Sequence, residues 1–135
     1  MKIDRIWKLL IFILLFVSFF SCTVGNGQFA FKYDLDDAFR RIEGDIEFAA
    51  DKRVDWIYRF NRNIISSKIG IIILKKEIVW VEVKSRSIML ENDRIIYGTI
   101  EGLDEGTYKI MLTDVMNEAE IDEVIFNVYN DDENG

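Results

Sequence analysis

The chain contains no histidine and no proline, and only one of its 135 residues is cysteine. Without an imidazole, Ser-His-Asp and Cys-His catalytic arrangements and the usual Cys/His zinc sites are excluded. One cysteine cannot form an internal disulfide. Carboxylate pairs remain as catalytic candidates, but nothing in the sequence fixes their separation. We therefore interpret them as solvated loop charge, and we predict no enzyme activity and no cofactor.

An excess of basic residues is also missing. Lysine and arginine number 17 against 24 aspartates and glutamates, which gives a net charge of −7. Removing residues 1–21, with Lys2, Arg5 and Lys8 against Asp4, would leave −9. Phosphate-backbone binding needs clustered positive charge, so we expect no nucleic-acid partner.

The sequence has an apolar run but no long one. Residues 9–20 are apolar except for Ser18, and they follow three basic residues. A spanning helix needs about 20 apolar residues, so the run is more typical of an export signal. Ser21, a small residue, directly precedes Cys22, the only cysteine.

Phe19-Phe20-Ser21-Cys22 resembles a relaxed bacterial lipoprotein lipobox, with phenylalanines where the family prefers leucine and then a small or β-branched residue. The resemblance implies cleavage before Cys22, a diacylglyceryl group on its thiol and a further acyl chain, such as palmitate, on the new amino terminus. It assigns residues 1–21 to a signal peptide and 22–28 to the lipidated cysteine and tether. An ordinary cleaved signal or an uncleaved anchor is the alternative.

Alternating apolar and polar residues then predict strands. The clearest case is Val54, Trp56, Tyr58 and Phe60, ended by Asn61-Arg62-Asn63. Residues 69–74 are apolar on both faces and predict a central strand. Further strands are expected at 29–35, 79–84, 88–90, 94–100, 107–112 and 123–128, with a hairpin turn at 91–93 and either a short helix or extended chain from residue 36.

Leu103, Gly106 and Tyr108 form an L-x-x-G-x-Y pattern before a strand whose inward side chains would be Tyr108, Ile110 and Leu112. This pattern resembles the tyrosine corner of immunoglobulin-like and fibronectin type III sandwiches. The resemblance implies an all-β fold: a single antiparallel immunoglobulin-like β-sandwich of about seven strands over residues 29–129. A partly open barrel is the alternative fold, and residues 130–135 are predicted to be an acidic disordered tail.

Two sets of side chains are binding candidates. Trp80 shares the polar face of its strand with Glu82 and Lys84, and with Tyr97 or Tyr129 it could form an aromatic binding face. The loop carboxylates Asp114, Glu118, Glu120 and Asp122 are candidates for calcium, although they lack the EF-hand pattern.

These features together predict a non-enzymatic protein of the bacterial cell envelope, exported and anchored to a membrane through acyl chains on Cys22. Its domain would bind or scaffold another envelope protein. The alternatives are a module that binds glycan or cell wall and a small hydrolase that uses paired carboxylates.

Overall fold

The computed structural model describes residues 4–11, 26–33 and 38–131. Residues 4–11 form a short helix, and the rest of the secondary structure is β. The predicted lipobox, with Cys22, and residues 132–135 of the predicted tail lie outside the described residues. Within the described ranges, no helix has the length and hydropathy needed to cross a bilayer.

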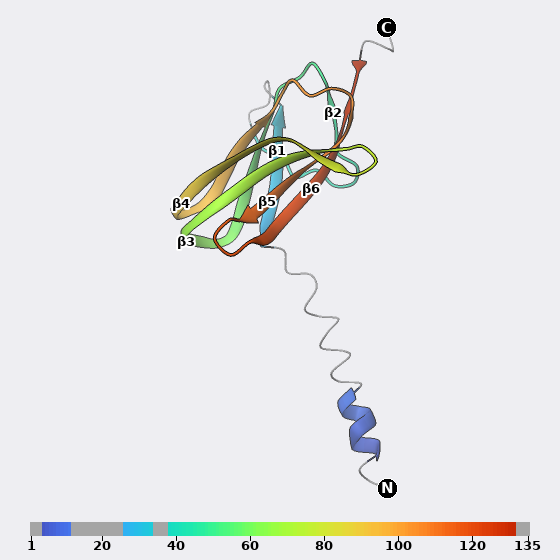
Figure 1. Ribbon diagram of the computed structural model, residues 1–135, viewed down its shortest axis with the longest axis vertical. Coiled ribbons are helices and arrows are strands. Elements are labelled where there is room, and N and C mark those ends of the chain that lie inside the picture. Colours follow the sequence, from blue (N-terminus) through green and yellow to red (C-terminus); the bar gives the residue numbers. More distant parts are fainter. Residues whose placement is uncertain (1–3, 12–25, 34–37, 132–135) are drawn as a thin grey trace.

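Within the described residues, six strands make up the β domain (Figure 1). They are β1 (Gly27–Tyr33), β2 (Glu47–Ala49), β3 (Val54–Lys76), β4 (Trp80–Ile100), β5 (Gly106–Asp114) and β6 (Ala119–Tyr129). Their hydrogen-bonded order is β1-β3-β5-β6-β2, with β4 on the other side of β3. All pairs are antiparallel except β2 with β6, which is parallel.

The strands β3 and β4 are long because each serves both layers of a sandwich. The first half of β3 pairs with β1 and with the end of β4. The second half of β3 pairs with β5 and with the beginning of β4. The result is a three-stranded layer facing a layer built from β4, β3, β5, β6 and β2, and the predicted all-β sandwich is confirmed.

Two turn predictions are wrong. Residues 61–63 do not end a strand, and residues 91–93 are not a hairpin turn, because β3 and β4 continue through both places. The β3–β4 register shifts between Arg59 and Ile64, and Asn92 has a φ of 53°. Asparagine tolerates this left-handed conformation, so these residues bend the paired strands from one layer into the other instead of reversing the chain.

The core lies between the layers and follows the predicted alternation. Tyr58 and Ile110 are both 0% exposed, although they come from different layers. The strands β3, β5 and β6 supply most of the remaining core: Val54, Trp56, Phe60, Ile69, Ile71, Ile73, Tyr108, Leu112, Phe126 and Val128. A half-buried hydrogen bond also joins the layers, because the Tyr58 hydroxyl donates to Asp122 at 2.9 Å.

The segment between β1 and β2, for which helix and extended chain were both considered, is not helical over its described residues 38–46. Arg40 makes an isolated antiparallel bridge to Phe31, with backbone hydrogen bonds of 2.9 and 2.8 Å. This bridge pairs the N–H and C=O groups of Arg40 without a regular element.

Candidate binding surface

Trp80 begins β4 opposite Lys76, on the outer side of the larger layer. The Nζ atoms of Lys76 and Lys109 lie 5.2 and 4.6 Å from the centre of its indole ring. Lys109 also forms an ion pair with Glu123 at 3.2 Å, and this lysine side chain is only 14% exposed. Each ammonium group is attracted to the negative face of the ring, so the two lysines hold the half-buried Trp80 in place on this surface.

The surface around Trp80 is partly apolar. The strand registers bring Leu74, Lys109 and Ile125 side by side across three strands. Neighbouring positions on the same side complete what we call the outer face: Ile72, Leu74, Trp80, Lys109, Met111, Glu123 and Ile125. Ile125 is 49% exposed, although it is a large apolar residue in the middle of a strand. Apolar surface bordered by charge is typical of protein-binding sites.

The hairpin that joins β3 to β4 extends this apolar surface. It turns at Glu77, whose N–H donates to the Val79 carbonyl at 2.9 Å. Ile78 is 98% exposed and Val79 is 65% exposed, directly before Trp80. Two large apolar side chains are therefore presented to solvent next to the ring.

The three predicted binding aromatics do not share one cavity. Tyr97 is on the later half of β4, paired with Ile57 in the smaller layer. Tyr129 ends β6 and lines a different cavity with Tyr33 and other residues from neighbouring segments. Trp80 lines neither of the cavities that contain the two tyrosines. The structure therefore places Trp80 apart from the cavities that contain the two tyrosines.

The predicted tyrosine corner has the geometry of that motif. The hydroxyl of Tyr108 donates to the backbone carbonyl of Asp104 at 2.7 Å. Leu103 packs against the core, and Gly106, with a φ of 156°, begins β5. Burial raises the pKa of the Tyr108 hydroxyl, partly opposed by Lys75, whose Nζ lies 5.8 Å from the ring centre. A neutral hydroxyl is the form that can donate this bond.

Two of the predicted calcium ligands, Asp114 and Asp122, make hydrogen bonds to different parts of the chain. Asp114 accepts hydrogen bonds from the Asn117 side chain at 2.7 Å and from the Met116 N–H at 3.1 Å, and the Asn117 bond is the main reason its pKa is lowered. Asp122 accepts from Tyr58, and burial is the main cause of the raised pKa of that tyrosine. In the part of the chain that is described, no three acidic or cysteine residues form a group able to hold a metal ion.

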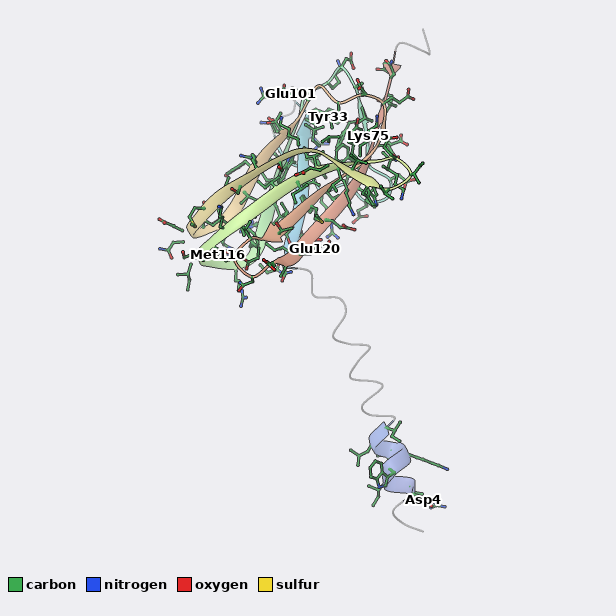
Figure 2. The ribbon with its side chains drawn as sticks, viewed as in Figure 1. Asp4, Tyr33, Lys75, Glu101, Met116 and Glu120 are labelled. Atoms are coloured by element: carbon green, nitrogen blue, oxygen red, sulfur yellow. The ribbon has the colours of Figure 1, made fainter. Side chains whose placement is uncertain are left out.

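The remaining two candidate calcium ligands, Glu118 and Glu120, lie in and just after the turn between β5 and β6. Glu118 has a φ of 52° in the β5–β6 turn, and Glu120 pairs with Thr113 inside the ladder. Figure 2 shows Met116 and Glu120 at the end of the sandwich opposite Glu101. The turn is therefore far from the tyrosine corner.

Neither a family model nor a curated protein matches the chain. Among solved structures, it is similar to an immunoglobulin-like protein from Pseudomonas aeruginosa, with 11% identity, a TM-score of 0.50 and coverage of 76% of this chain and 93% of the other. This chain therefore has an immunoglobulin-like β-sandwich fold. Lower scores are found for the C-terminal domain of Wzt (TM-score 0.44, 10% identity, 78% and 75% coverage) and for a CARDB domain from Pyrococcus furiosus solved with di-metal ions (0.38, 14%, 77% and 88%).

Proposed function

We propose that this chain is a non-enzymatic, lipid-anchored immunoglobulin-like domain that binds another protein of the bacterial cell envelope through its outer face. The observation that carries the proposal is Trp80, held by two lysines on an uncovered and partly apolar sheet surface. Large aromatic side chains next to charged groups are the usual anchors of protein interfaces. The exposed Ile78 and Val79 beside it add apolar area that a partner would bury.

The anchor is supported by the leader. Basic residues precede an apolar run that ends in Ser21-Cys22, and this cysteine has no possible disulfide partner within the chain. Each acyl methylene buried in a bilayer contributes about 0.8 kcal/mol, and two or more chains are needed for stable attachment. Two or three chains on Cys22 would hold an acidic domain at the membrane despite its charge.

The intact mass of protein extracted from membranes tests the anchor. We expect residues 22–135 plus two or three acyl chains, and a Cys22→Ser variant that lacks them. A wild-type mass without acyl chains would refute the anchor and leave an ordinary secreted or signal-anchored domain. That result would not bear on the proposal that the outer face binds a protein.

Crosslinking in intact cells tests the surface. Full-length wild type, Trp80→Ala and the matched control Tyr97→Ala would be crosslinked, and the adducts compared by mass spectrometry. Tyr97 is 60% exposed but lies in the other layer, so its loss leaves the outer face intact. We expect a defined envelope protein whose adduct is lost in Trp80→Ala and kept in Tyr97→Ala. Equal adducts in both variants would contradict the outer face as the binding site.

The glycan-binding alternative has a different outcome in the same variants. Retention on cell-wall polysaccharide that Trp80→Ala abolishes would favour a carbohydrate module over a protein-binding domain. Hydrolytic turnover that disappears when one loop carboxylate is changed to its amide would favour the hydrolase.

A further inference from the structure

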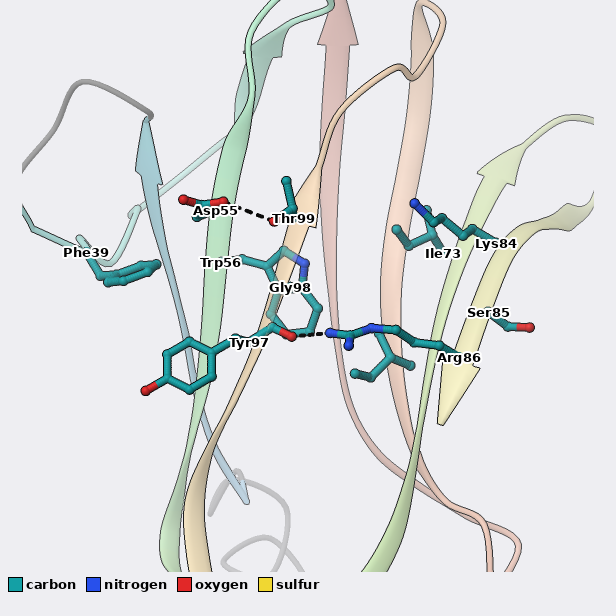
Figure 3. A pocket seen from close by; sticks show the side chains of 11 residues that line it. Phe39, Asp55, Trp56, Ile73, Lys84, Ser85, Arg86, Tyr97, Gly98 and Thr99 are labelled. Carbon is teal, nitrogen blue, oxygen red and sulfur yellow. Dashed lines mark hydrogen bonds between the residues drawn. The ribbon is translucent and has the colours of Figure 1, made fainter. Parts of the chain in front are cut away.

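A cavity of about 460 Å³ opens between the two layers, along the side where both halves of β4 form the sheet edges (Figure 3). Its lining comes from both layers, with Trp56 and Gly98 on one side and Ile73, Lys84 and Arg86 on the other. Pockets of roughly 300–1,000 Å³ are the size that small molecules occupy. The cavity is separate from the outer face, because none of the residues that define that face line it.

The apolar side of the cavity is built around Trp56. This residue is 1% exposed and lies opposite Gly98, where any side chain would overlap the indole ring. The absence of a side chain at position 98 therefore lets the indole lie against the β4 backbone. Ile71 and Ile73 supply aliphatic surface across the gap.

The indole N–H of Trp56 has no hydrogen-bond acceptor. Within the described residues, its Nε1 is the only buried side-chain nitrogen or oxygen without a partner. Figure 3 shows this nitrogen on the edge of the ring that points across the gap towards Ile73 and Lys84. Indole N–H groups are normally paired when buried, and this unpaired one belongs to a residue that lines the cavity, although the nitrogen itself is buried beneath the cavity surface.

The opposite side of the cavity carries positive charge. A register shift pairs Ile73 with Lys84 and Leu74 with Glu82, leaving Val83 as the extra residue. Directly paired residues share a face of the sheet, so the bulge turns Lys84 towards the side of the buried Ile73. Arg86 pairs with Ile71 and lies on that side too.

These two cations are available to a ligand. Neither Lys84 nor Arg86 belongs to an ion pair among the described residues. Arg86 donates from Nη2 to the Tyr97 carbonyl, which leaves its other guanidinium donors. The one acidic residue that lines the cavity, Asp55, already accepts hydrogen bonds from Thr99 at 3.0 Å and from Arg53 at 3.3 Å.

We propose that this cavity binds a small organic carboxylate. Its apolar body lies against Trp56 and Ile73, and its carboxylate accepts hydrogen bonds from Lys84 and Arg86. Two unpaired cations beside an apolar wall, on a chain whose net charge is −7, favour an anion with an apolar part over a neutral or cationic molecule.

Benzoate and its neutral analogue benzamide test the proposal. The full chain, ¹⁵N-labelled and held in nanodiscs of zwitterionic lipid, would be titrated with each while the indole N–H resonances are recorded. Trp7→Phe and Trp80→Phe variants identify the Trp56 resonance by elimination. We expect benzoate to shift the Trp56 resonance saturably, with an affinity at least about tenfold above that of benzamide, because only benzoate makes charge-assisted hydrogen bonds.

Charge variants separate this site from general anion binding. Lys84→Gln combined with Arg86→Gln should weaken benzoate binding by about tenfold or more. Both side chains are exposed, so the fold should persist, and an unchanged dispersion of amide resonances verifies this. The control Lys68→Gln removes an exposed lysine that does not line the cavity and should leave the affinity unchanged. The proposal is refuted by an absent saturable shift, by equal affinity for benzamide, or by equal binding to the double variant.

Discussion

Replacing Gly98 by alanine tests how tightly the two layers fit around Trp56. A methyl group at position 98 would overlap Cε2, Cζ2 and Nε1 of the indole. Trp56 is only 1% exposed, so the cavity beside it is the one place that offers the ring room for a shift. Overpacking of this kind costs about 1–3 kcal/mol, and a rigid bicyclic ring favours the upper end.

A second term opposes this cost. Glycine inside a strand is less favourable than alanine by about 0.5–1 kcal/mol, because it loses more backbone freedom on folding. Taking about 3 kcal/mol for the overlap and about 1 kcal/mol for the gain, we expect Gly98→Ala to lower the free energy of unfolding by about 2 kcal/mol. For a domain of this size, that change corresponds to a fall in Tm of about 10 °C.

Urea unfolding of wild type, Gly98→Ala, Trp56→Phe and the double variant measures the coupling between the two positions. The phenyl ring lacks Cζ2 and Nε1, two of the three atoms that the new methyl group would overlap. Gly98→Ala should therefore cost little in the Trp56→Phe background, giving a coupling energy of about 1–3 kcal/mol. An equal cost in both backgrounds would refute the steric account, and so would a cost below about 0.5 kcal/mol in the wild type.

Three further predictions concern polar groups. Tyr108→Phe should lower the free energy of unfolding by about 1–2 kcal/mol in urea, because the Asp104 carbonyl loses its donor; no change would contradict a stabilising corner. The raised pKa of Tyr58 means that its stabilisation is complete below the usual 10.0 and is lost as pH rises above it, so Tyr58→Phe should flatten the alkaline part of the stability curve. The lowered pKa of Asp114 works in the opposite direction: its stabilisation is present above the usual 3.8 and is lost as pH falls below it, and Asp114→Asn should show no such acid dependence at this position in chemical unfolding.

The sequence predicted the layers better than their connections. Trp56 and Tyr58 on β3, and Ile110 and Leu112 on β5, are buried as their two-residue period indicates. Alternation is a local property of a strand with one buried face, so it survives in the folded protein. The tyrosine corner was also predictable, because its hydrogen bond spans only four residues.

The strand connections could not be predicted because they depend on pairing between distant residues. Asn92 and Asp93 are residue types that favour turns. The paired strand β3 bends beside them, however, and keeps this part of the chain in a bent strand. The bulge at Val83 is equally invisible in the sequence, although it decides which way Lys84 faces. The cavity could therefore not be predicted from the sequence. The contact between Lys109 and Trp80 could not be predicted either, because Lys109 comes from a distant strand, β5.

The beginning of β4 carries both proposed surfaces, and the bulge at Val83 separates them. Trp80 lies on the outer face of the larger layer, whereas Lys84 lines the cavity between the layers. A protein bound over Trp80 would thus leave the cavity side of Lys84 uncovered, and a carboxylate in the cavity would not touch the Trp80 ring. Trp80→Ala should affect only the crosslinked partner, and the change at Lys84 and Arg86 should affect only benzoate binding. If each change impaired both, β4 would act as one coupled unit that transmits ligand binding to the outer face.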